Sequence, residues 1–417
     1  RRHRFRRERT LRNRLGLVNL RESWHWLNLS IADWNFRLKQ RPFLRRRTTL
    51  RNVIVAPIEE MLMRWAGGSI WRGGPQQPPG RPCSALNHYR GNHAVSDPAT
   101  ALDGADDWPM ETKRLFWCGP IVNHFGHQLG EFGGRVLMAS LDHRQGSLLF
   151  LHPDANQSMA TLLAWQQAWI RFLNPGRKPI LISSGRFRAQ ELVIIPEHQR
   201  LGQAPSPSYL TALTRRGQTL AAAAIDNIVV LSRARFAPGN DPGRLQGSVA
   251  GEHQFDAWMA SQGAQIIFPE TLPLDDQLRL LHNAKRLVIA EGSALHALEL
   301  IGWQPDKQVA VIARRPLWKG MDRPLRSRFP QLLWIDSVEA LWWMPPFNPR
   351  VKGIARLNWA QVMLSLSDYL GLHATESDIN AVTQAAFEQI RALLKRAPLN
   401  FHACTSDDRR PQREGGW

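Results

Sequence analysis

The pattern of apolar and polar residues is clearest in the second half of the chain, where short apolar runs alternate with amphipathic segments. The runs 227–231 (NIVVL) and 287–290 (LVIA) are continuous and rich in β-branched residues. Such runs are typical of parallel strands that are covered on both faces. Further strands are predicted at 265–268 and 308–313, and helices at 252–262 and 274–284. Strands that alternate with helices of about ten residues predict βαβ crossovers and a parallel sheet.

The first half shows the same alternation without any repeated sequence. Strands are predicted at 52–56, 115–118, 148–151, 180–183 and 192–195, and helices at 123–141, 159–173 and 208–224. After residue 316 the pattern loosens into a stretch rich in Trp and Pro, 334–349. Two helices are expected to follow, one at 357–370 and one from a capping box of Thr375 and Asp378 through residue 395. Both are candidates to pack back across the first half.

The length and the pattern together indicate several units. A chain of 417 residues is long for a single core and suits two α/β domains. We expect a basic N-terminal arm over 1–47, a first domain over 48–224, a second over 225–350, C-terminal helices over 351–400 and a tail over 401–417.

Charge changes this picture mainly at the N-terminus. The net charge is +19, and residues 1–51 carry sixteen Lys or Arg against three acidic residues. Trp24, Trp26 and Trp34 lie among these basic residues. A basic segment with tryptophans suits an anionic membrane surface or nucleic-acid phosphates, and a solvated extension is the plainer alternative. As a partner for residues 1–47 we expect the membrane surface rather than nucleic acid.

Apolar spans and cysteines indicate the cell compartment. No stretch approaches eighteen consecutive apolar residues, and the basic start lacks the apolar core of a signal peptide. Cys83, Cys118 and Cys404 have no metal-ligand spacing, and an odd count argues against a disulfide framework. We therefore expect a cytoplasmic protein, one able to lie at the inner face of the membrane.

Candidate chemistry lies where the predicted strands end. Arg233 follows the strand 227–231, and Gly292 and Ser293 follow the strand 287–290. Ligands of parallel sheets bind beyond the carboxyl ends of the strands, so these residues should face one crevice. Glycine lets a ligand approach the backbone, and we expect Ser293 to cap a helix whose first amide groups attract anions. A tightly packed turn with no ligand is the alternative.

A second candidate lies in the first half, on the predicted helix 123–141. His127 and Glu131 are four residues apart, so they project from one face of that helix. A carboxylate that holds one imidazole nitrogen suits a general base. The alternative is an internal pair that only stabilises the helix. A metal site of His124, His127 and Glu131 is a weaker hypothesis, and we expect neither a metal nor a cofactor.

Two segments resemble glycosyltransferase family 61. In the second half the residues that carry the likeness are Ser232-Arg233, Glu252 and PLDDQLRLLHNAKRLVIAEGSALH over 273–296. In the first half it is NHFGHQLGE over 123–131, similar to the family's Asn-x-x-x-His-x-x-x-Glu segment. The likeness extends over 116–312. The chain departs from the family pattern at Gly251, which replaces Asn, at Glu291, which replaces His, and at His296, which replaces Thr.

The resemblance implies a fold and a set of site residues. The implied fold is α/β and GT-B-like: two Rossmann-like domains with mainly parallel sheets that face a central cleft, with the donor on the C-terminal side and the acceptor largely on the N-terminal side. His127, Glu131 and Arg233 are the implied catalytic residues. The implied donor-binding residues are Arg233, Glu252, Gln277, Gly292, Ser293, Ala294, Leu295 and His296.

The implied activity is a glycosyltransferase of capsular or other cell-surface polysaccharide biosynthesis. It would transfer a hexosyl or pentosyl group from a nucleotide-sugar donor to a saccharide or glycolipid acceptor, without a metal. Two alternatives remain. A polysaccharide pyruvyltransferase has a turn that resembles Ser293-Ala294-Leu295-His296, and a non-catalytic protein could bind membrane or nucleic acid through the basic arm. The donor, the acceptor, the stereochemistry of transfer and the oligomeric state stay open.

Overall fold

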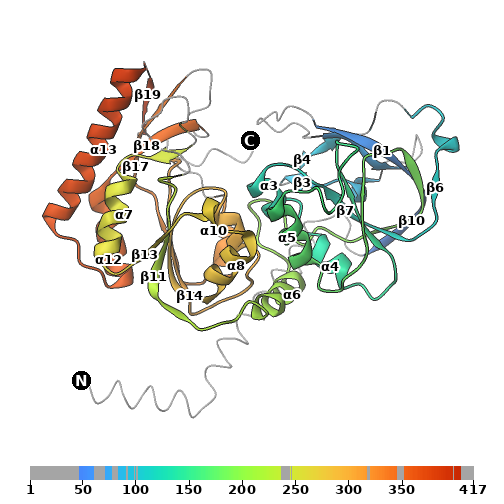
Figure 1. The fold of residues 1–417 in the computed structure, drawn as a ribbon, viewed down its shortest axis with the longest axis horizontal. Helices are drawn as coiled ribbons and strands as arrows, with labels where there is room; N and C mark the ends of the chain where they lie inside the picture. Colours follow the sequence, from blue (N-terminus) through green and yellow to red (C-terminus); the bar gives the residue numbers. More distant parts are fainter. Residues whose placement is uncertain are drawn as a thin grey trace, which may run out of the picture.

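The computed structural model describes residues 47–60, 71–77, 83–90, 93–97, 99, 102–235, 245, 247–316, 320–344, 352–397 and 399–404. Within these ranges the chain forms two large sheets, a smaller third sheet and a layer of helices between the first two (Figure 1). The basic arm 1–46 and the tail 405–417 lie outside the described residues. The predicted α/β class is confirmed, with several parallel strand pairs.

The first sheet has eight strands in the order β5-β2-β1-β10-β7-β8-β9, and β6 pairs with β10. Its strands are β1 (Thr48–Glu60), β2 (Trp71–Gln76), β5 (Ser96–Asp97), β6 (Met110–Glu111), β7 (Leu115–Pro120), β8 (Ser147–Leu151), β9 (Ile180–Ser183) and β10 (Phe187–Ile194). The strands from β10 to β9 are parallel to one another, whereas β1 is antiparallel to both of its neighbours. The sheet is therefore mixed. A hairpin of β3 (Tyr89–Arg90) and β4 (His93–Ala94) lies beside it.

The second sheet is parallel throughout, in the order β13-β11-β14-β15-β16. Its strands are β11 (Ile225–Leu231), β13 (Gln265–Ile267), β14 (Ala284–Ala290), β15 (Gln308–Ile312) and β16 (Leu332–Ile335). The last four residues of β11, β14 and β15 are all buried, as continuous apolar runs predict. The first four strands were predicted from the sequence, and β16 was not.

A layer of helices joins the two sheets into one apolar core. It contains α3 (Phe125–Gly130), α4 (Val136–Ser140), α5 (Ala164–Leu173), α6 (Pro207–Gln218), α8 (Leu274–Asn283), α9 (Leu295–Leu298) and α10 (Asp322–Arg326). Phe150 and Trp169 on the first side and Leu278 and Val311 on the second belong to one continuous cluster of buried side chains. The two halves are thus packed directly on each other.

The C-terminal part covers the outer face of the second sheet. The helices α7 (Glu252–Ser261), α12 (Trp359–Leu370) and α13 (Glu376–Arg396) pack there with a third sheet of β12 (Ser248–Val249), β17 (Val338–Trp343), β18 (Gly353–Leu357) and β19 (Asn400–Ala403). The predicted capping box of Thr375 and Asp378 is confirmed. Among the described residues α12 and α13 pack on the second sheet, so the expected packing across to the first half is wrong.

Two predicted helices differ from the structure near the candidate site. The helix expected over 123–141 is broken into α3 and α4, and between them a β-carbon on Gly134 would overlap the backbone of Gln199. The helix expected after Ser293 has only four residues, and Ser293 does not cap it. The stretch 334–349, read as irregular, contains the end of β16 and all of β17.

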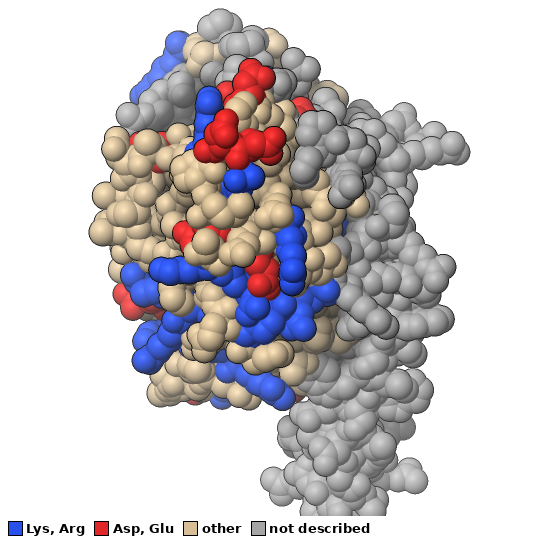
Figure 2. All heavy atoms as spheres, turned by 90° about the vertical axis from the view of Figure 1, so that its right-hand side faces the viewer, with Lys and Arg blue, Asp and Glu red and all other residues tan. Residues whose placement is uncertain are grey.

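Basic residues gather on the face of the first sheet that Figure 2 turns toward the viewer. Arg47, Arg51, Arg114, Arg144 and Lys178 surround Asp142 and Glu191. Cations therefore outnumber acids in this cluster, which we call the Asp142 cluster. No helix in the described part of the chain is long and apolar enough to cross a membrane.

Candidate functional site

The carboxyl edge of the second sheet brings Arg233 and Gly292 together. The adjacent parallel strands β11 and β14 end at Leu231 and Ala290, so the residues that follow them are neighbours. A β-carbon at position 292 would overlap the Arg233 guanidinium. Glycine is therefore required here for close approach of an arginine side chain. The two residues share one place in the fold, as their positions after strand ends indicated.

Two further arginines lie at this edge and were missed. Arg314 and Arg315 follow β15, which pairs with β14. The Arg314 guanidinium lies against Gly247, where a β-carbon would overlap it, and Arg314 Nε donates a hydrogen bond to the carbonyl of Glu291 over 2.9 Å. The strand over 308–313 was predicted from the sequence. Residues that follow the carboxyl ends of parallel strands are candidates for ligand binding, so Arg314 and Arg315 could have been identified in the same way as Arg233.

Glu291 organises the turn that carries both arginines. Its carboxylate is fully buried and accepts hydrogen bonds from the backbone amides of Arg314 and Arg315, each over 3.1 Å. It also forms an ion pair with the Arg315 guanidinium. The glutamate that departs from the family pattern thus fixes the backbone and one side chain at the strand edge.

The electrostatics of this edge favour an anion. Burial lowers the pKa of Arg233, although the carboxylates of Glu252 and Glu291 oppose that shift. Burial, followed by the charge of Arg315, lowers the pKa of Arg314 to about 9. Both pKa values are lowered because desolvation penalises the charged form, so a positive charge here is costly without a matching anion. A diphosphate or carboxylate ligand placed at this edge would be stabilised by charge-assisted hydrogen bonds.

Glu252 and Asp256 place two buried carboxyl groups behind the arginines. Glu252 Oε1 accepts a hydrogen bond from the backbone amide of Arg233 over 2.8 Å, and Asp256 accepts one from Ser232 Oγ over 2.6 Å. Burial raises the pKa of Glu252 to about 7 and that of Asp256 to about 6. Both carboxyls line a small cavity with Phe255 and Trp359. Within the described residues Glu252 Oε2 and Asp256 Oδ1 have no hydrogen-bond partner.

The second candidate pair, His127 and Glu131, is in contact on α3 and at its end. His127 Nδ1 lies 2.8 Å from Glu131 Oε2, and the Glu131 side chain is fully buried. Arg90 from β3 holds the same carboxylate through two hydrogen bonds of 3.0 and 2.9 Å. Arg90 was not predicted from the sequence, because the packing of a short hairpin against α3 produces no recognisable pattern of residues along the chain.

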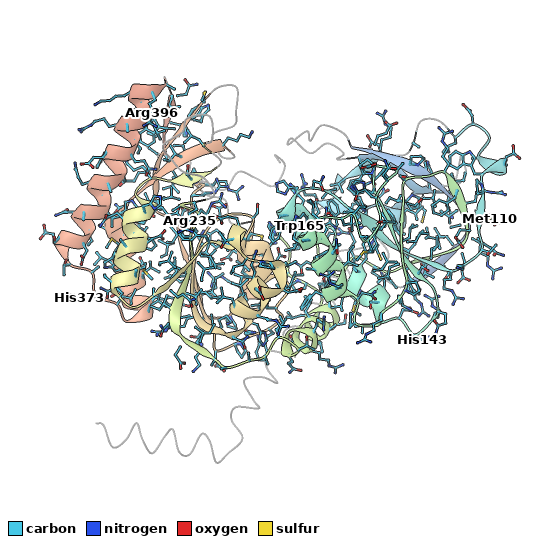
Figure 3. All side chains as sticks on the ribbon, viewed as in Figure 1. Met110, His143, Trp165, Arg235, His373 and Arg396 are labelled. Carbon is cyan, nitrogen blue, oxygen red and sulfur yellow. The ribbon has the colours of Figure 1, made fainter. Side chains whose placement is uncertain are left out.

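His124 completes this group at the start of α3. Its ring caps the helix by accepting a hydrogen bond from the backbone amide of His127, and the two ring centroids are 4.3 Å apart. Burial, and then the neighbouring His127 and His296, lower the pKa of His124 to about 4. The adjacent Phe125 packs edge-on against Trp165 of α5, labelled in Figure 3, which anchors the helix start. His124 is therefore a neutral neighbour of the His127–Glu131 pair near neutral pH.

Contact between α3 and α9 joins the two candidate groups. A β-carbon on Gly126 would lie 2.9 Å from His296 Cδ2 and 3.4 Å from Ser293 Oγ, and one on Gly130 would overlap His296. His296 Nδ1 in turn lies 2.6 Å from Glu299 Oε1. Two glycines on α3 therefore let the turn after β14 approach the helix that carries His127.

The remaining predicted residues have structural contacts. The Gln277 side chain donates hydrogen bonds to the carbonyls of Pro269 and Leu272 and so supports the short helix η4 (Pro269–Thr271). Leu295 is fully buried in the core, and Ala294 precedes α9 without a side-chain cap. Ser293 does not cap α9, which has only four residues, so the expected cap is wrong and the anion site at this turn stays a prediction. Arginines supply the positive charge at this edge.

The described ranges contain no group of three or more His, Cys, Asp or Glu side chains that could hold a metal ion. Residues 122–308 match the family model described as Glycosyltransferase 61. The resemblance to glycosyltransferase family 61 is thus confirmed over this segment. No curated protein matches the chain.

The family 61 match covers a little less than half of the chain and includes every residue predicted for the site, from His127 to His296. The family implies transfer of a glycosyl group from a donor to an acceptor. Arg90, Arg314 and Arg315 lie outside the matched residues. The structure adds these three side chains to the site that the family likeness indicates.

Proposed function

We propose that the protein transfers a hexosyl or pentosyl group from a nucleotide-sugar donor to a polysaccharide or glycolipid acceptor during assembly of capsular or other cell-surface polysaccharide. The observation that carries the proposal is the gathering of Arg233, Arg314 and Arg315 at the carboxyl edge of the parallel sheet. Such an edge is where open α/β sheets bind ligands, and its charge suits a diphosphate.

The donor side would stabilise the leaving group. As the bond between the anomeric carbon and the diphosphate oxygen breaks, negative charge grows on that oxygen. Preorganised guanidinium groups at that position stabilise the developing charge, which is the role proposed for Arg233 and Arg315. The carboxyl groups of Glu252 and Asp256 suit hydroxyl groups of the ribose or sugar, because a buried carboxyl oxygen without a partner gains a hydrogen bond from them.

The acceptor side would remove a proton. With Nδ1–H donated to Glu131, the Nε2 atom of His127 is left as the hydrogen-bond acceptor. In the proposed step the acceptor oxygen forms a bond to the anomeric carbon and its proton passes to that nitrogen. The nucleoside diphosphate leaves with the electron pair of the broken bond. His296, beside Ser293 and α3, is proposed to contact the donor phosphates.

The two halves are proposed to work in the GT-B manner, with the donor on the second sheet and the acceptor on the first. The support is that α3, which follows β7 of the first sheet, contacts α9, which follows β14 of the second. His127 and Arg233 come from opposite halves. Transfer would therefore take place where these elements meet.

A peripheral membrane contact is proposed at the N-terminal side, with the enzyme in the cytoplasm at the inner face of the membrane. The arm 1–46 lies outside the described residues, but Arg47 and Arg51 belong to the Asp142 cluster. Net positive charge there suits anionic lipid headgroups. Sedimentation with vesicles that contain phosphatidylglycerol should deplete the protein from solution, and high salt or deletion of 1–47 should abolish this. Equal binding to neutral vesicles would contradict the proposal.

The activity is tested by product release. The protein is incubated with UDP-, GDP- and CMP-sugars, with and without cell-surface oligosaccharides, and nucleotide release is measured. We expect release from one donor class, increased by an acceptor. A parallel assay with phosphoenolpyruvate tests the alternative: its consumption, with no nucleotide released from any sugar donor, would favour a pyruvyltransferase and contradict the proposal. Loss of nucleotide release on deletion of 1–47 would also contradict it, because a soluble acceptor does not require the arm.

A further inference from the structure

Arg90 forms an ion pair with Glu131, the carboxylate partner of the proposed general base, and has no place in the family likeness. Its Nε donates to Glu131 Oε1 over 3.0 Å and its Nη2 donates to Glu131 Oε2 over 2.9 Å. Oε2 is also the partner of His127 Nδ1, and Arg90 Nη2 is 3.4 Å from that nitrogen. This fork geometry fixes both oxygens of one carboxylate.

From this geometry we infer that Arg90 is a positioning residue: it fixes the Glu131 carboxylate and, through it, the tautomer of His127. The inference rests on the proposed role of His127 as the base. Nδ1–H donation to Oε2 leaves Nε2 unprotonated toward substrate, and a carboxylate that rotated would lose this arrangement. The bidentate hold of Arg90 prevents that rotation.

The backbone of Arg90 is placed by a buried polar network rather than by its own loop. Arg135 Nη2 donates to the carbonyls of Ala85 and Asn87 over 3.1 and 2.6 Å, and Glu197 accepts from the backbone amide of Tyr89 over 3.1 Å. The hairpin pairing then sets Arg90 opposite residue 93. Buried donors and acceptors of this kind specify one position for the segment, because displacing it would leave them unpaired.

The charge of Arg90 acts on a carboxylate that burial alone would neutralise. Burial raises the pKa of Glu131, but the hydrogen bonds from His127 and Arg90 together outweigh it, and the net pKa is lowered. An ionised Glu131 can only accept hydrogen bonds, so it holds the Nδ1–H tautomer. Without the guanidinium, burial would favour a protonated Glu131, whose hydroxyl would compete for Nδ1.

Other charged and titratable groups face the pair from the adjacent elements. They are His124 at the start of α3 and His296 and Glu299 on and after α9. With a pKa of about 4, His124 carries no charge near neutral pH. His296 is paired with Glu299 over 2.6 Å. Removal of Arg90 therefore removes the cation that directly contacts Glu131, while the groups on α9 keep their own pairing.

The test uses the full chain with ¹⁵N-labelled histidine, in wild type, Arg90→Gln and Arg90→Lys, with His127→Gln to assign the signal and Arg279→Gln as an exposed control. Nitrogen chemical shifts report which ring nitrogen carries the proton. We expect the Nδ1–H form of His127 in wild type and Arg279→Gln, its partial loss in Arg90→Gln, and recovery in Arg90→Lys, which restores the charge. An unchanged tautomer in folded Arg90→Gln, or in folded Arg90→Met should Arg90→Gln fail to fold, would overturn the inference.

Turnover separates this inference from the proposed function. In Arg90→Gln we expect kcat for the donor identified above to fall about tenfold or more at neutral pH, with little change in KM. We also expect the acid limb of the pH profile to move to higher pH, because the Glu131–His127 pair retains a proton longer. A change in tautomer with no change in kcat supports the positioning role of Arg90 and instead contradicts His127 as the base. A fall in kcat that is equal at every pH, with the tautomer unchanged, overturns the inference.

Discussion

The Arg233 guanidinium occupies the space in which a β-carbon would lie if residue 292 were not glycine. The two residues follow adjacent parallel strands, and Arg233 Nε also contacts the carbonyl of Gly247 over 3.4 Å. The arginine is thus held between two glycines at the sheet edge. This arrangement holds a half-buried guanidinium at the sheet edge.

Substitution Gly292→Ala tests this packing. The added methyl group must displace the Arg233 side chain, and overpacking of this kind costs about 1–3 kcal/mol of stability. We expect donor affinity to fall at least about tenfold, measured by calorimetry, together with a lower unfolding midpoint. Gly185→Ala is the matched control, since a β-carbon there meets only Ser183 Oγ at 4.0 Å. Equal donor affinity in wild type and Gly292→Ala would contradict the assignment.

Substitution Glu252→Gln should change how stability depends on pH. In the unfolded chain this carboxyl ionises near the ordinary glutamate pKa of 4.5, whereas burial raises its pKa in the fold to about 7. The group therefore favours the fold below about pH 4.5, and this advantage is lost as the pH rises through about 7. The free energy of unfolding of wild type relative to Glu252→Gln should fall by on the order of 3 kcal/mol between about pH 4 and about pH 8.

Denaturant titrations across this pH range provide the measurement. Glutamine keeps the oxygen that accepts from the Arg233 amide, so packing is conserved. Asp256, whose pKa is raised to about 6 by burial, is present in both proteins, and its charge adds to the raised pKa of Glu252. A constant difference between the two proteins at every pH would show that Glu252 is ionised in the fold near neutral pH.

Replacement of His127, the proposed base, should lower the rate of catalysis without lowering the stability of the fold. For His127→Ala we expect kcat to fall about a hundredfold or more, because proton removal is lost, while the unfolding midpoint changes little. His143→Ala is the control, since His143 is exposed on the first half (Figure 3) and lies outside the proposed site. Full activity in His127→Ala would leave the pair with Glu131 as a structural contact only.

Metal independence follows from the proposal that guanidinium groups meet the charge of the leaving diphosphate. Dialysis against EDTA should leave the rate of nucleotide release unchanged, and added Mn²⁺ or Mg²⁺ should not raise it. The measurement is the rate before and after chelation. Loss of activity in EDTA with rescue by Mn²⁺ would require a metal that the proposed mechanism lacks.

Much of the fold follows from local pattern, and its exceptions have identifiable causes. The buried runs that became β11, β14 and β15 could be predicted because a strand covered on both faces is apolar along its whole length. The break between α3 and α4 could not, because it depends on Gly134 meeting the backbone of Gln199, a contact distant in sequence.

In the candidate site, too, the residues that follow a local pattern could be predicted, and those that depend on distant contacts could not. Arg233 and Gly292 were predictable from strand ends, and His127 with Glu131 from helical spacing. Arg90 was not, because a two-residue strand carries no periodicity and its contact with Glu131 exists only after the hairpin has packed on α3. Ser293 and α9 show the reverse error: serine after a strand suggested a cap, but the turn is closed by backbone hydrogen bonds.

The central claim is that Arg233, half-buried at the sheet edge, holds the donor diphosphate. It is tested most directly by titrating nucleoside diphosphates and their sugars into wild type, Arg233→Ala and Arg235→Ala in a calorimeter. Arg235 lies two residues away with its guanidinium over the Phe268 ring, so its removal controls for loss of charge (Figure 3). We predict binding of at least one nucleotide to wild type and Arg235→Ala, and affinity lower by about a hundredfold in Arg233→Ala. Equal affinity in all three proteins would contradict the account.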